Sequence, residues 1–307
     1  MGPTASGKTA AALALADAHN VAIVSVDSAM VFRGLDIGTA KPSNTIRRVH
    51  PHALVDVRNP SESFSASDFL AEADCAVLRA FDSGRLPLLV GGSMLYFRAF
   101  REGLTPLPAA SPEFRADLKR RAAERGVSAL HEELAGIDPE CASGIDPNNY
   151  SRIERALEVE ALTGKPLSAW WKSSPGVPAT QRHGARLVEF AITELSRERL
   201  HQRISTRLDR MLADGFVDEV AALLEQPDVT PESQAMRSVG YMQVCSHLQD
   251  CSESTDLLRE RVLAATRQAA KRQLTWLRRW PEVEARLRLD PETAAEQLAE
   301  EFRSIDG

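Results

Sequence analysis

The chain has 307 residues, of which 43% are hydrophobic and 26% charged, a composition typical of a water-soluble globular protein and unlike that of a disordered one. Its 37 Lys and Arg against 43 Asp and Glu give a net charge of −6, which excludes a uniformly basic protein. The length allows one large or two ordinary domains.

Charge is unevenly distributed near the end of the chain. Residues 259–279 contain seven basic residues and one acid, whereas residues 281–307 contain eight acids and three bases. The net charge therefore leaves room for a basic patch that binds nucleic acid.

The cysteines and the apolar runs indicate the compartment. Cys75, Cys141, Cys245 and Cys251 are too few and too scattered for a disulfide framework. No apolar run approaches the length of a membrane span, and no signal peptide precedes the first motif. We expect a cytoplasmic protein with reduced thiols.

The first motif fits the pattern G-x-x-x-x-G-K-[ST] of a phosphate-binding P-loop and comprises Gly2, Pro3, Thr4, Ala5, Ser6, Gly7, Lys8 and Thr9. Such a loop turns backbone N–H groups toward a phosphate at the start of a helix. Lys8 adds a cation, and the Thr9 hydroxyl can ligate Mg²⁺. The alternative is a chance Gly-rich turn, but the alanine-rich helical pattern over 9–18 favours a P-loop.

A P-loop requires a strand that enters it, and here only Met1 precedes Gly2. We expect that the natural chain begins further upstream and that Met1 is an internal residue. The alternative is that the first, central strand is missing.

Strand and helix patterns alternate after the P-loop. Residues 21–26, 53–55 and 86–90 read as strands, and residues 65–79 read as a helix with Ser65 as N-cap and Asp68 three residues later. This alternation predicts an α/β fold, a P-loop NTPase-like parallel sheet flanked by helices, with ligands at the carboxyl ends of the strands.

Two irregular stretches divide the chain. Residues 105–112 are rich in proline, residues 113–171 are almost wholly helical in pattern, and residues 173–184 form a second boundary before a strand-like run over 187–192. We expect a P-loop α/β core over 1–110, an all-helical insertion domain over 111–184, and completion of the core by C-terminal helices over 185–307.

Ordered blocks of sequence resemble one family. The blocks are GPTASGKT (2–9), DSAMVFRGLDIGTAKP (27–42), VGGSMLY (90–96), RALEV (155–159), TGKPLS (163–168), MRSVGY (236–241) and KRQLTWLR (271–278). In this order they resemble the tRNA dimethylallyltransferases, also called tRNA isopentenyltransferases. The likeness is to the bacterial form, because the Cys/His zinc-finger spacing of eukaryotic members is absent.

The resemblance implies a prenyltransferase of tRNA modification. Its members transfer a dimethylallyl group from dimethylallyl diphosphate to N6 of the adenosine immediately 3′ of the tRNA anticodon and release diphosphate. The partners implied are the anticodon stem-loop of tRNA and dimethylallyl diphosphate, with Mg²⁺ as cofactor and no membrane. We expect a monomer.

Two residues are candidates for the chemistry. Asp27, at the end of a predicted strand, is the candidate base for the adenine amine. The alternative for Asp27 is a carboxylate that orients Mg²⁺ through water. Ser93 stands where family members usually have Thr, and by resemblance its hydroxyl binds the amine or the diphosphate. The alternative for Ser93 is a cap of the following helix.

Arg203 and Arg207 lie four residues apart and so share one face of a helix. By resemblance Arg207 clamps the diphosphate. For Arg203 a solvated face is an equal alternative.

The candidate tRNA contacts form four segments, in which cations would follow the RNA backbone and other groups would hold a base extruded from the loop. They are Asp27, Ser28, Ala29 and Met30; Ser151, Arg152, Ile153, Glu154 and Arg155; Arg237, Ser238, Val239, Gly240, Tyr241 and Met242; and Lys271, Arg272, Gln273, Leu274, Thr275, Trp276, Leu277 and Arg278. For the last segment an ordinary amphipathic helix is the alternative. Met242 replaces the usual Arg or Lys, which removes one phosphate contact.

Two other function classes remain open at this point: a P-loop nucleoside or nucleotide kinase, and a tRNA-binding module without catalysis. The histidines show no zinc-ligand spacing apart from the pair His50 and His52, which we take as structural or surface residues.

Overall fold

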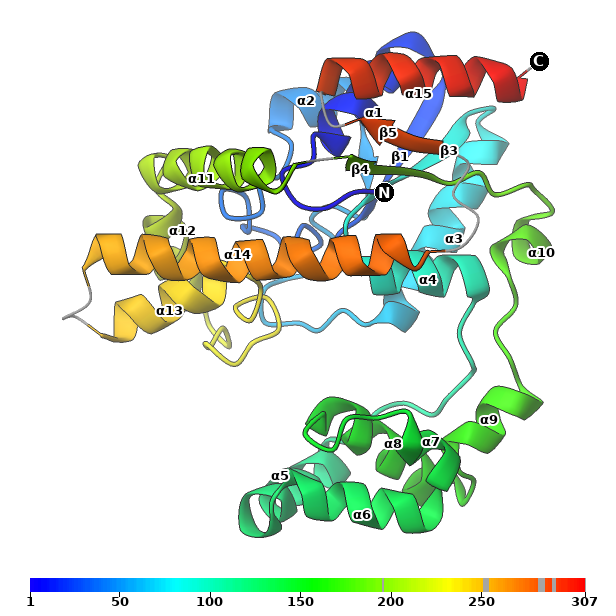
Figure 1. The fold of residues 1–307 in the computed structure, drawn as a ribbon, viewed down its shortest axis with the longest axis vertical. Coiled ribbons are helices and arrows are strands. Elements are labelled where there is room, and N and C mark those ends of the chain that lie inside the picture. Colours follow the sequence, from blue (N-terminus) through cyan, green and yellow to red (C-terminus); the bar gives the residue numbers. More distant parts are fainter. Residues whose placement is uncertain (195, 251–253, 281–284, 289–290, 307) are drawn as a thin grey trace. The chain divides into compact units, whose positions relative to one another are not determined.

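The computed structural model describes residues 1–194, 196–250, 254–280, 285–288 and 291–306. Cys251 therefore lies outside the described residues. The chain forms two compact units, one of residues 1–101 and 183–307 and one of residues 102–182 (Figure 1). Among the described residues, no helix is both long and apolar enough to cross a membrane.

The first unit contains a parallel sheet of three strands. β1 (Val21–Val26) lies between β2 (His52–Ala53) and β3 (Leu86–Gly91). β1 pairs with β3 along its whole length, and its side chains are almost all buried, as expected of a strand covered on both faces. The predicted parallel sheet is confirmed.

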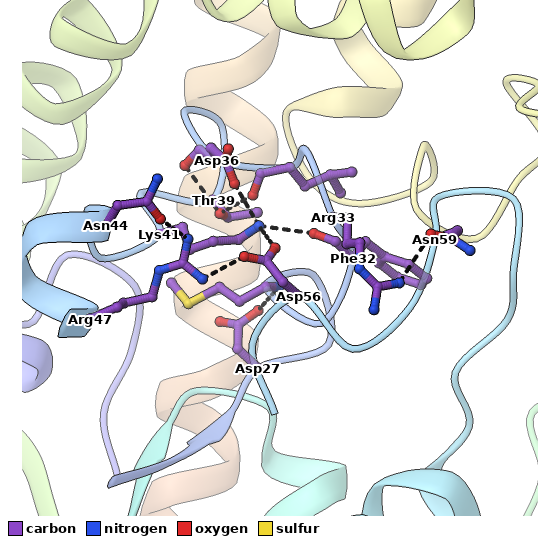
Figure 2. A network of polar contacts seen from close by, with 12 residues as sticks. Asp27, Phe32, Arg33, Asp36, Thr39, Lys41, Asn44, Arg47, Asp56 and Asn59 are labelled. Atoms are coloured by element: carbon purple, nitrogen blue, oxygen red, sulfur yellow. Dashed lines mark hydrogen bonds and ion pairs between the residues drawn. The ribbon is translucent and has the colours of Figure 1, made fainter. Parts of the chain in front are cut away.

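The second strand ends earlier than the predicted run over 53–55. Leu54 and Asp56 both have positive φ, 63° and 58°. A side chain in this left-handed region cannot continue a strand, so pairing stops at Ala53. Asp56 is thereby turned into a polar network (Figure 2).

A second parallel sheet pairs β4 (Phe190–Glu194) with β5 (Ala285–Arg288). β4 begins three residues later than the predicted run over 187–192. β5 is missing from the sequence prediction, which placed only helices in this part of the chain. Met1 follows the β4 backbone: its ammonium nitrogen donates to the Phe190 carbonyl at 2.7 Å, and the Ile192 N–H donates to its carbonyl at 2.9 Å.

Helices cover the sheets of this unit. They include α1 (Lys8–Ala18), α2 (Asn44–Val49), α3 (Ala66–Asp82), α4 (Met94–Glu102) and α15 (Pro291–Asp306). In α3 the Ser65 and Asp68 side chains form the predicted capping box. Ala11 and Leu15 of α1 pack against Leu298 and Phe302 of α15, and the two helices lie side by side in Figure 1.

Four more helices of the first unit position the site. They are α11 (Arg197–Ala213), α12 (Phe216–Leu224), α13 (Tyr241–Gln249) and α14 (Thr255–Arg278). α14 packs along α11 and also contacts α13 (Figure 1). The Gln273 side chain of α14 donates to the Gly92 carbonyl at 2.9 Å, which ties this long helix to the loop after β3.

The second unit consists of α5 (Pro112–Arg125), α6 (Val127–Ile137), α7 (Pro139–Ser143), α8 (Tyr150–Thr163), α9 (Leu167–Ser173) and α10 (Ala179–His183), whose last residue, His183, falls in the first unit. Its core contains the fully buried Leu118, Leu130, Leu134 and Ile153. The Glu158 carboxylate is enclosed beside this core and accepts bonds from the guanidinium groups of Arg115 and Arg155.

Candidate active site

A cavity of about 640 Å³ lies where the carboxyl ends of β1 and β3 meet the helices that follow. Its walls come from the P-loop, the segment after β1, the loop after β3 and helices α11 to α14. Lining residues that carry the argument below are Thr4, Ala5, Asp27, Gly38, Thr39, Ser93, Arg207 and Gln273.

The P-loop has the backbone of a phosphate-binding loop. Ala5 and Gly7 have positive φ, 60° and 87°, and α1 begins at the next residue, Lys8. The first amides of a helix have no partner within the helix, so those at the start of α1 suit an anion. The Lys8 ammonium folds back over the loop and donates to the Pro3 carbonyl at 3.2 Å.

Two arginines of α11 join Lys8. The Arg203 Nε donates to the Ala5 carbonyl at 2.9 Å, so Arg203 braces the P-loop and does not simply face solvent. The Arg207 Nη2 donates to the Thr39 carbonyl at 2.8 Å. The spacing of four residues indicates that both arginines lie on one face of a helix. The sequence does not decide whether Arg203 faces the site or the solvent.

Burial lowers the pKa values of Lys8 and Arg207. Burial lowers the pKa of Lys8 from 10.5 to about 8, with Asp27 opposing and Arg207 adding to the change. Burial likewise lowers the pKa of Arg207, and Asp27 again opposes. Two cations therefore share the field of one carboxylate, an arrangement that favours a bound anion.

Asp27 and Ser93 line the same cavity, as the sequence predicts for its two candidate catalytic residues. The Asp27 Oδ1 accepts from the N–H groups of Ala29 and Met30 at 2.9 and 3.2 Å, and Figure 2 shows it below the loop that follows β1. The Ser93 Oγ accepts from the Ser28 N–H at 3.0 Å. The two strand ends are thus joined at the cavity, while the roles of both side chains stay predictions.

One side of the cavity is apolar. Ile204, Leu208 and Met211 of α11 face it together with Phe216 and Val262 from α12 and α14. The cavity therefore combines a cationic, amide-rich end with a hydrocarbon wall, which suits a ligand that has both an anionic and an apolar part.

The candidate tRNA contacts of the first unit are divided between cavity and surface. Residues 27–29 and 237–241 line the cavity, whereas Lys271, Arg272, Thr275 and Arg278 are exposed on α14. Met242 is 48% exposed. Gln273 is engaged within the protein. Its Oε1 accepts from the Thr4 N–H at 2.9 Å, so the side chain links the P-loop to the Gly92 carbonyl.

In the helical unit the predicted segment 151–155 is only partly accessible. Ile153 is fully buried. The Arg155 guanidinium donates to Glu158 and to the Pro108 carbonyl. Exposed members that remain for an RNA contact are Ser151 and Arg152.

Thr9 and Asp27 offer oxygen donors suited to a hard cation. In the part of the chain that the structure describes, no three His, Cys, Asp or Glu residues form a metal-binding group. The pair His50 and His52 is engaged locally: His50 Nε2 lies 2.9 Å from the Asp17 carboxylate, and His52 Nδ1 lies 2.6 Å from the His50 carbonyl. Mg²⁺ commonly takes one or two protein ligands and completes its coordination shell with phosphate and water. The Thr9 hydroxyl and the Asp27 carboxylate are ligands of this type and number.

Comparison with known proteins assigns the family. Residues 30–280 match the family model described as "IPP transferase". The chain belongs to the IPP transferase family. It is 50% identical over 300 residues to a protein of Alkalilimnicola ehrlichii named tRNA dimethylallyltransferase, covering 98% of this chain and 92% of the relative.

Solved structures of IPP transferases agree in fold. The full-length tRNA isopentenylpyrophosphate transferase of Bacillus halodurans matches with a TM-score of 0.69 at 33% identity, over 99% of this chain and 94% of that one. A eukaryotic dimethylallyltransferase acting on tRNA matches with a TM-score of 0.80 at 24% identity, over 99% of this chain and 78% of that one, which shows the shared fold.

The low pKa of Lys8 predicts a pH dependence of stability for this IPP transferase. Between about pH 8 and 10.5 the unfolded state holds a proton on Lys8 that the folded state has lost. The free energy of unfolding therefore gains a contribution that is fully present above 10.5 and is lost as the pH falls through about 8. Urea unfolding of wild type and Lys8→Met should show a stability difference that changes with pH in this window. A difference that is constant across the window would contradict the buried ammonium.

Proposed function

We propose that this IPP transferase moves a dimethylallyl group from dimethylallyl diphosphate to N6 of the adenosine immediately 3′ of the tRNA anticodon, releasing diphosphate. Its tRNA dimethylallyltransferase activity follows from family membership and from 50% identity to a protein of that name over 98% of the chain. The adenosine position and the residue roles below are our proposals.

The observation that best supports the substrate is the two-sided cavity. Thr4 and Ala5 of the P-loop and Arg207 line a site for a diphosphate, with Lys8 in the field of Arg207, and the wall of Ile204, Leu208 and Met211 provides a place for a five-carbon tail. A nucleoside triphosphate would also use the cationic end, but it has no hydrocarbon tail for the apolar wall.

Transfer needs a stabilised leaving group and a base. As the bond between C1 of the dimethylallyl group and the diphosphate oxygen breaks, negative charge grows on the diphosphate, where Lys8 and Arg207 stabilise it. The adenine amine forms the new C1–N6 bond and loses a proton. In our proposal the Asp27 carboxylate accepts that proton and Ser93 holds the amine or the diphosphate. A carboxylate that only orients Mg²⁺ is the competing role for Asp27.

Mg²⁺ is the proposed cofactor, held by Thr9, by the substrate's phosphate oxygens and by water. When bound, it would neutralise charge that develops on the departing diphosphate. Lys8 and Arg207 supply the protein's own share of that charge.

The partners proposed are dimethylallyl diphosphate and the tRNA anticodon stem-loop. An enzyme that modifies a loop base extrudes it from the stack, and residues 27–29 and 237–241 line the cavity that would receive it. The exposed cations of α14 and of segment 151–155 are our candidates for backbone contacts. We place the protein in the cytoplasm as a monomer.

The kinase alternative is separated by following a label. With tRNA as acceptor, label from the dimethylallyl group of dimethylallyl diphosphate should enter tRNA, whereas label from the γ-phosphate of ATP should not. A control with tRNA whose target adenosine is replaced by guanosine should stay unlabelled, because guanosine lacks the N6 amine. Incorporation of the ATP label alone would exclude the transferase.

The role of Asp27 has a separate test. Asp27→Asn keeps the side-chain shape but cannot accept a proton, so the single-turnover transfer rate should fall by about 10² to 10⁴, the usual contribution of a general base. Affinity for tRNA should change little. Asp17→Asn, a loss of one exposed carboxylate in the same unit, is the matched control. A near wild-type rate in Asp27→Asn would remove Asp27 as the base, and recovery at high Mg²⁺ would favour the metal-orienting role.

A further inference from the structure

The segment Asp36 to Thr39 lies between the cavity and α12. Gly38 and Thr39 line the cavity. A Cβ on Gly38 would lie 2.1 Å from the Phe216 ring and 2.7 Å from the Tyr241 ring, so the backbone itself packs against two aromatic side chains. Close approach of this kind fixes where the segment can run.

One carboxylate binds this segment through consecutive amides. The Glu219 Oε2 accepts from the N–H groups of Asp36 and Ile37 at 3.0 and 2.6 Å. Its Oε1 accepts from the Gly38 N–H at 3.1 Å. Oε1 also accepts from the Tyr241 hydroxyl at 2.6 Å. Four donors converge on one ionised side chain, and bonds to an ionised acceptor are stronger than neutral ones.

The surroundings preserve the donor state of Tyr241. Its side chain is fully buried, and burial together with the Glu219 charge raises the pKa of the hydroxyl. The hydroxyl therefore stays protonated at neutral pH and can donate to the carboxylate.

Lys41 binds the first residue of the segment through the Asp36 side chain, as Figure 2 shows. Its side chain is 1% exposed, and its ammonium donates to Asp36 Oδ1 and Asp56 Oδ1 at 2.6 Å each and to the Phe32 carbonyl at 2.9 Å. Burial alone would raise the pKa of Asp56, but bonds from Lys41 and Arg47 lower it. Glu219 therefore binds the backbone of the segment, and Lys41 binds its Asp36 side chain.

This segment carries the acceptor that orients Arg207. The Thr39 carbonyl, one residue beyond the amides that Glu219 binds, takes the Arg207 Nη2 at 2.8 Å. A guanidinium held by a fixed carbonyl has fewer orientations to lose when it binds an anion. We propose that Glu219 is a positioning residue: it orders Asp36 to Thr39, and the Thr39 carbonyl then aims Arg207 at the diphosphate. The proposal rests on the proposed function for the role of Arg207.

Glu219→Gln tests the proposal because it keeps the size of the side chain and replaces one acceptor oxygen with an NH₂ group. That group faces backbone donors and cannot accept from them. We expect the dissociation constant of inorganic diphosphate, measured by calorimetry, to rise about tenfold, the equivalent of one charged hydrogen bond. The KM for dimethylallyl diphosphate should rise in parallel. The dissociation constant of tRNA should change less than about twofold, well below the tenfold change expected for diphosphate.

A thermodynamic cycle separates positioning from a general loss of structure. In Arg207→Met, which removes the group that Glu219 is proposed to aim, adding Glu219→Gln should change the diphosphate constant by less than about twofold, because the two effects share one path. Asp218→Asn removes the adjacent exposed acid of α12 and should bind diphosphate like wild type.

Three results would overturn the proposal: additive effects in the cycle, a wild-type diphosphate constant in Glu219→Gln, or no weakening by Arg207→Met. If Glu219→Gln does not fold, Tyr241→Phe removes one of the four bonds and should weaken diphosphate about threefold; a wild-type constant there would overturn the proposal as well. Because diphosphate binding is measured without transfer, these results are independent of whether dimethylallyl label enters tRNA.

Discussion

The site is built around positive charge that the fold buries next to a phosphate-binding loop. Lys8 and Arg207 lie within the field of one another and of Asp27, and Arg203 braces the loop from behind. Burying like charges together costs free energy unless a counter-charge arrives. The arrangement is therefore most stable when an anion occupies the cavity. The same cations stabilise a leaving group more strongly as its negative charge grows during the reaction.

The rest of the first unit keeps these cations in place. Gln273 of α14 joins the P-loop to the end of β3, and Arg203 joins the P-loop to α11. Glu219 and Lys41 hold the segment whose Thr39 carbonyl receives Arg207. Apart from the local bond between Lys41 and Asp36, each link joins parts far apart in sequence through a polar side chain bonded to a backbone group, which gives a loop-built site the rigidity of the helices behind it.

Sequence patterns predicted what depends on local chemistry. The run over 21–26, the capping box of Ser65 and Asp68, and the P-loop with its following helix all appear in the structure as expected. Asp27 and Ser93 meet in one cavity because parallel strands end at the same edge of a sheet, and Arg207 lines the same cavity from α11. The family resemblance, confirmed by the match to known relatives, supplied the activity; charge and periodicity did not.

Contacts between segments far apart in the chain could not be predicted from the sequence. Residues 285–288 form a strand only because β4 lies beside them, and Ala-Arg-Leu-Arg carries too little β signal to predict one. The positive φ values that end β2 have no glycine to announce them. Glu219 gave no signal either, since one acid on an amphipathic helix looks like a solvated surface residue until its amide partners are known. Gln273, likewise, is one polar residue of a basic helix, and its bonds to Thr4 and Gly92 could not be predicted from the sequence.

We infer that the buried cations form a binding site for diphosphate. The most direct test is the pKa of the Lys8 ammonium, followed by NMR in the free protein and with saturating inorganic diphosphate. We expect a value near 8 in the free protein and a rise toward or above the ordinary 10.5 when diphosphate binds. A Lys8 pKa that stays near 8 with diphosphate bound would contradict this role for the buried charge.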